Sequence, residues 1–269
     1  MRMKTINKLL NLAGRRALIT GATGCLGQVI AHTLAELGAD LILLDKPGSS
    51  FAILEHGLRS EWNVNVMQLE CDLELEADRL RVINDVNNDG QALSILINNA
   101  AFVGTSNLQG WAVPFEQQTI DTWRRAIEVN LTAAFHLSQA FTPKLMASET
   151  GNIVNIASIY GEYGPDWRLY DGTAMGNAAA YGVSKGGLIQ LTRWLATTLA
   201  PAIRVNAISP GGIWRNQSEA FIASYSSRTP LNRMATEDDL RGAIAYLASD
   251  LSQYVTGQNL PVDGGWGIW

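Results

Sequence analysis

Tyr181 and Lys185 are the residues of this chain best placed to do chemistry. They stand four apart in a segment, 178–199, whose apolar pattern predicts a helix, and side chains at that spacing share one helix face. A nearby ammonium favours the ionised form of a phenol, whose usual pKa is about 10, so the pair could trade protons near neutral pH. The same spacing arises by chance on exposed helix faces, so the rest of the sequence must decide.

The composition favours a globular protein with one core. The chain has 269 residues, of which 47% are hydrophobic, and this is enough for a substantial core. It shows no linker, charge block or solenoid-length repeat. We therefore expect a single domain over 14–269, preceded by an N-terminal extension at 1–13.

Charge and hydropathy argue against two classes of partner. A net charge of −5 disfavours nucleic acid, because phosphate binding needs a concentrated basic surface. No run approaches the ~20 apolar residues of a membrane-spanning helix, and residues 1–12 are too polar for a secretory signal. We expect a small-molecule substrate, no membrane contact and a cytoplasmic location.

The cysteines and histidines do not indicate a metal site. Cys25 and Cys71 are too few for a disulfide framework or a thiolate cluster, and we expect both to be buried as small apolar residues. His32, His56 and His136 lack the spacing of metal ligands. The expected metal content is none.

Apolar runs alternate with helical patterns along the chain. Arg16–Thr20 predicts a buried strand, Leu26–Leu37 a helix, and Leu41–Leu44 a second strand that ends at Asp45. This alternation predicts an α/β fold, a parallel sheet with helices on both faces. Further helices are expected at 50–61, 74–86, 119–146, 178–199 and 235–249, and further strands at 64–69, 93–97, 152–157, 203–208 and 259–262. Residues 210–230 look less regular and are expected to cover the substrate.

A glycine-rich turn joins the first strand to the first of these helices. Gly21, Gly24 and Gly27 would let the backbone turn tightly and approach a pyrophosphate at the helix N-terminus. Asp45, behind the second strand, could accept hydrogen bonds from the adenosine ribose and repel a 2′-phosphate, which favours NAD over NADP. Lys46 acts against this preference, because a cation there could accept the phosphate. The alternative role for Asp45 is that of a strand-end turn residue.

Several motifs in order make the chain resemble the short-chain dehydrogenase/reductase family from about Gly14 to Trp266. They are Thr20–Gly27, Asp72, Asn98–Ala101, Asn130, Ser158, Tyr181-x-x-x-Lys185, Pro210–Gly211 and Thr256–Gly264. The resemblance implies a Rossmann-type, doubly wound, seven-stranded parallel sheet and a nicotinamide cofactor. It also implies a homo-oligomer, a dimer or homotetramer, packed through the long helices that hold Asn130 and Tyr181.

The resemblance also implies roles for single residues. Tyr181 would be the acid or base at the substrate oxygen, and Ser158 would hydrogen-bond that oxygen. Lys185 would lower the pKa of Tyr181 and hold the nicotinamide ribose, and Asn130 would hold a water that links Lys185 to solvent. The implied cofactor contacts are Gly21, Thr23, Gly24, Cys25, Leu26, Gly27, Asp45, Lys46, Asp72, Leu73, Asn99, Ala100, Ala101, Tyr181, Lys185, Pro210, Gly211, Gly212 and Ile213.

Two positions depart from the usual pattern of the family. Cys25 stands where the single-domain branch usually has its second glycine, and the glycine spacing is similar to that of the extended branch, which includes sugar epimerases and dehydratases. Because the chain closes soon after Val262, we keep the single-domain branch. Arg215 replaces a frequent Thr, and either serves a phosphate of cofactor or substrate or is a solvated loop cation.

An insertion at 164–172 would border the substrate. Its Trp167, Arg168, Tyr170 and Asp171 offer stacking and hydrogen-bonding groups suited to a sugar, or else form an oligomer contact or a solvent-facing loop. With 209–217, it is similar to flagellin-modification oxidoreductases of surface-sugar synthesis. We expect an NAD(P)-dependent enzyme that interconverts a secondary alcohol and a ketone. The alternatives are a cofactor-retaining sugar epimerase or dehydratase and a non-catalytic dinucleotide-binding protein.

Overall fold

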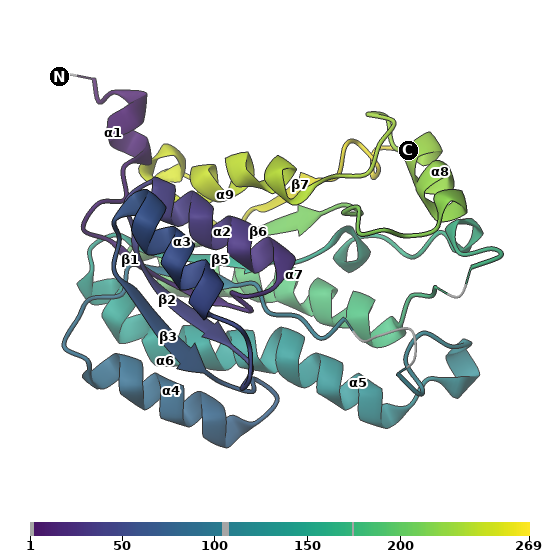
Figure 1. Cartoon of the computed structure of the whole chain (residues 1–269), viewed down its shortest axis with the longest axis horizontal. Coiled ribbons are helices and arrows are strands. Elements are labelled where there is room, and N and C mark those ends of the chain that lie inside the picture. The colour runs from purple at the N-terminus through teal and green to yellow at the C-terminus, as the bar shows by residue number, and fades with distance from the viewer. Residues whose placement is uncertain (1–2, 104–107, 174) are drawn as a thin grey trace.

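The computed structural model describes residues 3–103, 108–173 and 175–269. Within them, seven strands form one parallel sheet in the order β3-β2-β1-β4-β5-β6-β7 (Figure 1). The strands are β1 Arg16–Thr20, β2 Asp40–Asp45, β3 Val66–Glu70, β4 Ile95–Asn98, β5 Gly151–Ile156, β6 Ile203–Pro210 and β7 Asn259–Val262. The strand order reverses direction between β1 and β4, and the predicted doubly wound α/β fold is confirmed.

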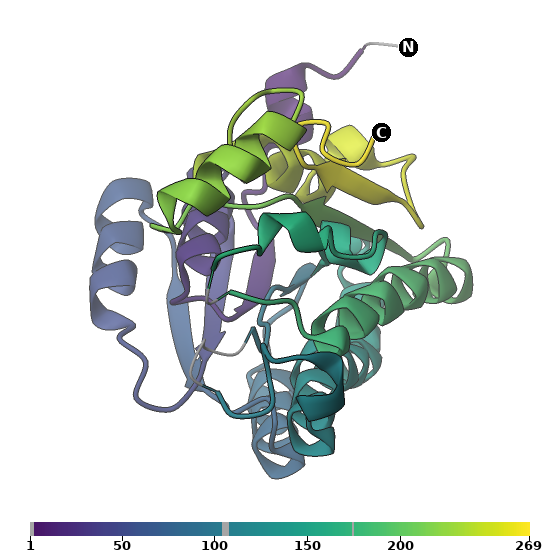
Figure 2. The ribbon, with the colours of Figure 1, turned by 90° about the vertical axis from the view of Figure 1, so that its right-hand side faces the viewer.

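Helices cover both faces of the sheet (Figure 2). They are α1 Ile6–Leu10, α2 Cys25–Glu36, α3 Ala52–Trp62, α4 Glu76–Asn88, α5 Ile120–Ile127, α6 Ala133–Ala147, α7 Ala179–Leu199, α8 Glu219–Arg228 and α9 Arg241–Ala248. No helix of the described ranges is long and apolar enough to cross a membrane.

Alternate residues of each central strand face two separate cores. In β1, Ile19 packs with α2, α3 and α9 in one cluster, whereas its neighbour Leu18 packs with α4, α6 and α7 in the other. Because successive side chains of a strand point to opposite faces, a strand that is buried on both faces is apolar throughout. This explains why β1 and β2 stand out as continuous apolar runs.

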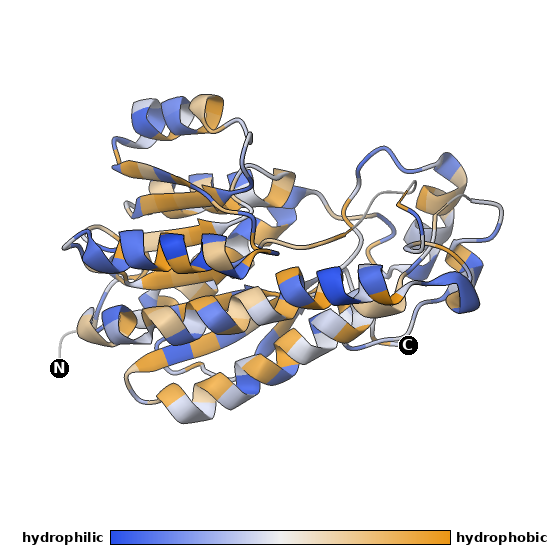
Figure 3. Ribbon diagram, turned by 90° about the horizontal axis from the view of Figure 1, so that it is seen from below, coloured by the Kyte–Doolittle hydropathy of each residue, from blue (hydrophilic) through white to orange (hydrophobic). Residues whose placement is uncertain are grey.

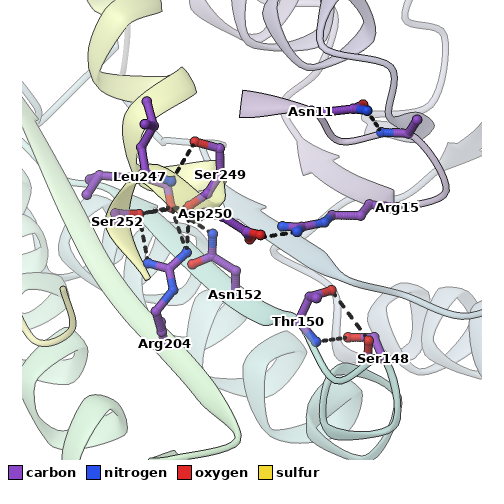
Figure 4. Close-up of polar contacts among 12 residues, drawn as sticks. Asn11, Arg15, Ser148, Thr150, Asn152, Arg204, Leu247, Ser249, Asp250 and Ser252 are labelled. Atoms are coloured by element: carbon purple, nitrogen blue, oxygen red, sulfur yellow. Dashed lines mark hydrogen bonds and ion pairs between the residues drawn. The ribbon is translucent and has the colours of Figure 1, made fainter. Parts of the chain in front are cut away.

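The amino end of the sheet is tied to the end of α9 by buried polar contacts (Figure 4). The Arg204 guanidinium of β6 donates to the backbone oxygens of Leu247 and Ser249, both at 3.2 Å, and to the Ser252 hydroxyl at 2.9 Å. Asn152 of β5 donates to the same Leu247 oxygen at 2.7 Å. These contacts satisfy the carbonyls where α9 ends. They also hold the amino ends of β5 and β6, which lie opposite the candidate site.

Some predicted elements differ from the structure. The helix expected at 119–146 is interrupted by a π-helical turn, Glu128–Thr132, between α5 and α6, and the one expected at 235–249 begins as a 3₁₀ turn at Glu237–Leu240 before α9. The irregular segment expected at 210–230 contains α8, whose apolar side packs inward.

One burial prediction was wrong. Cys25 is exposed, because it is the first residue of α2 and lies beside a cavity. Leu12, in the segment 1–13, is fully buried in the core with α2. Cys71 is buried as expected, and burial raises the pKa of its thiol to about 12.

Candidate active site

A cavity of about 700 Å³ lies at the carboxyl ends of the central strands, where ligands of open parallel sheets bind. It brings together most of the predicted site residues. Those that line it are Gly21, Thr23, Gly24, Cys25, Leu26, Gly27, Asp45, Lys46, Leu73, Asn99, Ala100, Ala101, Ser158, Tyr181, Lys185, Pro210, Gly211 and Ile213. The glycine turn and the Tyr181–Lys185 pair thus share one cavity.

The glycine turn is packed too closely for side chains at two of its positions. A Cβ on Gly27 would lie 2.0 Å from the Gly21 oxygen, and a Cβ on Gly21, which has φ +65°, would lie 2.9 Å from the Ala100 Cα. The turn therefore presents bare backbone to the cavity at the N-terminus of α2, where unpaired N–H groups favour an anion. This arrangement fits the pyrophosphate of a dinucleotide.

Asp45 connects the end of β2 to the glycine turn. Its Oδ2 accepts hydrogen bonds from the Thr23 amide at 2.7 Å and the Thr23 hydroxyl at 2.6 Å, and its Oδ1 accepts from the Lys46 amide at 2.8 Å. The carboxylate therefore stabilises the turn through its hydrogen bonds and also lines the cavity. Its contact with a ribose stays a prediction.

Tyr181 lies in the first turn of α7 beside the end of β5. Its side chain hydrogen-bonds to that of Ser158. The Ser158 hydroxyl accepts from the Tyr160 amide at 3.2 Å in the 3₁₀ turn Ile159–Gly161, which leaves its proton for the phenol or for a substrate oxygen. Burial raises the pKa of Tyr181, and the hydrogen bond with Ser158 lowers it.

Lys185 lies one turn further along α7 and is 2% exposed. Its Nζ donates to the Ile156 oxygen at 2.6 Å and stands 5.9 Å from the centre of the Tyr181 ring. Burial lowers the pKa of Lys185 to about 8. The net shift of the Tyr181 pKa is upward because of burial, and the groups that oppose it are Ser158 and Arg215, so the lowering expected from Lys185 stays a prediction.

Arg215 is a cation that lowers the pKa of Tyr181 in this structure. It lines the same cavity and forms an ion pair with Glu237 at 3.0 Å, with 45% of its side chain exposed. Arg215 is therefore not a loop cation remote from the site, because its charge acts at the phenol across a partly desolvated space.

Three predicted site residues do not line the cavity. Asn130 is buried in the π-helical turn, where its amide donates to the Ser184 hydroxyl at 2.9 Å and its Oδ1 accepts from the Phe102 amide. Asp72 caps the turn before α4, accepting from the Glu74 amide at 3.0 Å. Gly212 packs against α8, where its amide donates to the Tyr225 hydroxyl. Their predicted roles toward cofactor and water remain predictions.

The cavity also has lining residues that sequence reasoning missed, including Tyr160, Asn177, Trp111, Phe102, Met175 and Gln217. Two of them carried a usable signal, because Tyr160 follows Ser158 by two residues and Asn177 precedes Tyr181 by four. The sequence around Trp111 gave no such signal. Trp111 lines the cavity next to Phe102, which it contacts edge-on with ring centres 5.0 Å apart.

The insertion 164–172 contributes one of its four candidate residues to the cavity wall, Tyr170. Trp167 is 57% exposed. Arg168 points outward and pairs at 2.7 Å with Asp166, which also binds Arg228 of α8 at 2.6 Å. The insertion is therefore fastened to α8 by an ion pair, and Tyr170 is its contribution to the cavity wall.

Comparisons with known proteins agree with this site. The family model described as enoyl-(acyl carrier protein) reductase matches residues 21–267. A short-chain dehydrogenase from Leptospira borgpetersenii, solved with bound NAD⁺, is 33% identical, with a TM-score of 0.82 over 99% of this chain and 97% of that one. The chain belongs to the short-chain dehydrogenase/reductase family. It is therefore an oxidoreductase.

Two further members of the short-chain dehydrogenase/reductase family bear on the substrate. A gluconate 5-dehydrogenase from Burkholderia cenocepacia, solved with NADP and tartrate, is 29% identical, with a TM-score of 0.86 over 98% of this chain and 100% of that one. The post-translational flagellin modification protein A of Campylobacter coli is 27% identical over 96% of this chain and 100% of that protein. The similarity to flagellin-modification proteins is confirmed.

The buried Lys185 should make stability depend on pH. Its pKa in the folded protein, about 8, lies below the ordinary 10.5, so the unfolded chain binds more protons between these values and the free energy of unfolding rises with pH there. Across this pH window, we expect the free energy of unfolding of the wild type to rise by about 3 kcal/mol relative to that of Lys185→Met, since one pKa unit is worth about 1.4 kcal/mol. Urea unfolding at a series of pH values measures this, and a difference that stays constant with pH would contradict it.

Proposed function

We propose that this enzyme interconverts a secondary alcohol and a ketone by hydride transfer, with NAD(P) as cofactor and Tyr181 as general acid and base. One observation supports this above all. The Tyr181 side chain, hydrogen-bonded to Ser158, lines the same cavity as the bare glycine turn, so a proton donor and a dinucleotide site open onto one space.

The residues would divide the work as follows. The turn that contains Gly21 and Gly27 would hold the pyrophosphate, and Asp45 the adenosine ribose. A bound nicotinamide supplies or accepts the hydride. Tyr181 gives its proton to the carbonyl oxygen during reduction and takes it back during oxidation, while Ser158 donates a hydrogen bond to the same oxygen.

Lys185 would act through its position behind Tyr181. Its ammonium, held by the Ile156 oxygen, lies near enough to the phenol ring to favour the phenolate that forms when a proton leaves. Burial opposes ionisation of both groups. The protonation of the pair is therefore sensitive to nearby charge, and a bound cationic ring would favour loss of the Tyr181 proton.

The proposed substrate is polyhydroxylated, a sugar or a sugar derivative. The cavity wall carries Tyr160, Tyr170, Asn177 and Arg215, a group of donors suited to several oxygens on one small molecule. The similarity to a gluconate 5-dehydrogenase supports the same class.

For the cofactor, we propose a preference for NAD over NADP. Thr23 holds the Asp45 carboxylate at the cavity with two hydrogen bonds, so its negative charge is fixed where a 2′-phosphate would be repelled. Similar enzymes have been solved with either cofactor, and the choice therefore depends on local charge.

We also propose that the protein is a dimer or tetramer packed through α5, α6 and α7. These helices carry exposed apolar side chains, namely Trp123, Phe135, Val183 and Trp194. Figure 3 looks at the molecule from below, the side on which Figure 1 places these long helices, and shows hydrophobic stretches along them. Exposed apolar surface of this kind marks a contact face.

Replacement of Tyr181 by Phe should remove the proton donor while keeping the ring. We expect turnover to fall by about 10²- to 10⁴-fold, followed through the absorbance of the reduced nicotinamide with a panel of keto and hydroxy sugars. Tyr254→Phe, at a fully exposed tyrosine, is the matched control. Full turnover by Tyr181→Phe would refute the assigned donor, and turnover without net absorbance change in wild type would indicate an epimerase.

Substitutions at the ribose end should change the cofactor preference in opposite directions. Asp45→Ser should raise kcat/KM with NADP relative to NAD by about 10-fold or more, because it removes the repelling charge. Lys46→Gln should lower the NADP value and leave the NAD value nearly unchanged. Steady-state kinetics with both cofactors measure the ratios. A ratio that is the same in wild type and Asp45→Ser would exclude the proposed role of the carboxylate.

Light scattering of the purified protein tests the proposed assembly. We expect the mass of two or four chains, and we expect Trp194→Glu to shift it toward the monomer, because a charge at an apolar contact is left desolvated. Ile53→Glu on α3, an exposed apolar residue of another face, should leave the mass unchanged. A monomeric wild type would refute the proposal.

A further inference from the structure

A closed set of five aromatic side chains lies beside the cavity, and two of the five line it. Tyr160 contacts Trp266 edge-on, with ring centres 6.4 Å apart, and Trp266 stacks on Tyr225 at 6.1 Å. Tyr225 in turn stacks on Phe221 at 6.1 Å, and Phe221 contacts Tyr170 at 5.8 Å. The hydroxyls of Tyr170 and Tyr160, 2.7 Å apart, complete the set. We call these five residues the aromatic wall.

The aromatic wall is fixed by its burial and by its origin in four segments. Phe221, Tyr225 and Trp266 are all at most 5% exposed. Tyr160 belongs to the 3₁₀ turn after β5, and Tyr170 to the insertion that Asp166 fastens to α8. Because each ring is held by its neighbours, the two phenol hydroxyls have little freedom to turn away from each other.

Only the two tyrosines at the junction of the set, Tyr160 and Tyr170, line the cavity together with Tyr181. Tyr160 is held close to the proposed reaction centre, because its amide donates to the Ser158 hydroxyl. Neither hydroxyl has a part in the proton transfer assigned to Tyr181. The wall therefore presents a second polar point in the cavity, separate from the Ser158–Tyr181 oxygen site.

The Tyr160 and Tyr170 hydroxyls share one hydrogen bond, in which either oxygen can be the donor. The Asn177 side chain also hydrogen-bonds to Tyr160. Burial raises the pKa of Tyr160, so its phenol keeps its proton. Since each phenol has one proton and the shared bond uses one of the two, one proton of the pair remains for a group in the cavity.

Resting on the proposed function, we propose that the Tyr170 hydroxyl binds a second oxygen of the substrate and thereby selects polyols and sugar acids over simple alcohols. Tyr160 holds this hydroxyl through the 2.7 Å bond between them, and hydrogen bonds that share a group polarise one another. A substrate without the second oxygen leaves the remaining proton of the pair without a partner in the cavity, which costs binding energy in the transition state.

The experiment compares one polyhydroxylated compound with its monodeoxy analogues. The parent is the polyol or sugar acid that has the highest kcat/KM in a panel containing D-gluconate and xylitol. We expect Tyr170→Phe to lower kcat/KM for the parent by about 10- to 100-fold. For the one analogue that lacks the bound oxygen, we expect a change of less than about threefold. The variant keeps the aromatic ring, and its thermal unfolding is measured to show that the wall remains packed.

Asn177→Asp tests whether a proton of the Tyr160–Tyr170 pair is needed by the substrate. The carboxylate has nearly the same size but can only accept, so Tyr160 would donate to it, Tyr170 would donate to Tyr160, and no proton would face the substrate. We expect the same parent-selective loss as in Tyr170→Phe. Tyr163→Phe is the matched control, because Tyr163 also packs on Trp266, at 6.1 Å, but does not line the cavity. It should leave all kcat/KM values within about twofold.

The outcomes separate this inference from the proposed function. If Tyr170→Phe lowers kcat/KM equally for the parent and every deoxy analogue, or for none, the inference is overturned while the oxidoreductase function stands. If no polyol or sugar acid is turned over but a simple secondary alcohol is, both the inference and the proposed substrate class fail. If no compound is turned over with either cofactor, the proposed function fails and the inference fails with it.

Discussion

The contact between the first turns of α7 and the end of β5 is the constraint on which the site depends. Lys185 is bonded to the Ile156 oxygen, and Tyr181 hydrogen-bonds to the Ser158 side chain. Burial shifts their pKa values in opposite directions, that of the lysine downward and that of the tyrosine upward. Burial thus makes the pair sensitive to any further charge in the cavity.

The amino ends and the carboxyl ends of the strands differ in how their polar groups are satisfied. At the amino ends of the strands, partly buried polar side chains such as Arg204 donate hydrogen bonds to the carbonyls at the end of α9, so this end of the sheet is closed by contacts within the protein. At the carboxyl ends, glycines leave backbone groups facing a cavity. In a parallel sheet, all carboxyl ends of the strands lie on one side. Because the amino ends are closed by hydrogen bonds, the carboxyl ends can leave backbone groups unpaired for a ligand.

Much of the fold could be predicted because its signals are local. Buried parallel strands such as Leu41–Leu44 are continuous apolar runs, and β7 has the bounds expected for it, Asn259–Val262. The π-helical turn could not be predicted. At its centre Asn130 bonds to Phe102 and Ser184, partners 28 and 54 residues away, and no periodicity of the segment itself reports such contacts.

By itself the sequence determined the α/β class, the glycine turn and the spacing of Tyr181 and Lys185, because each depends on residues within a few positions of one another. Only the tertiary structure decided what surrounds them. It exposed Cys25, made Arg215 a cation near the phenol, and joined Tyr160 to Tyr170 through rings from four segments. Solvent exclusion and the direction of a hydrogen bond depend on all neighbours in space, and the chain order does not encode these directly.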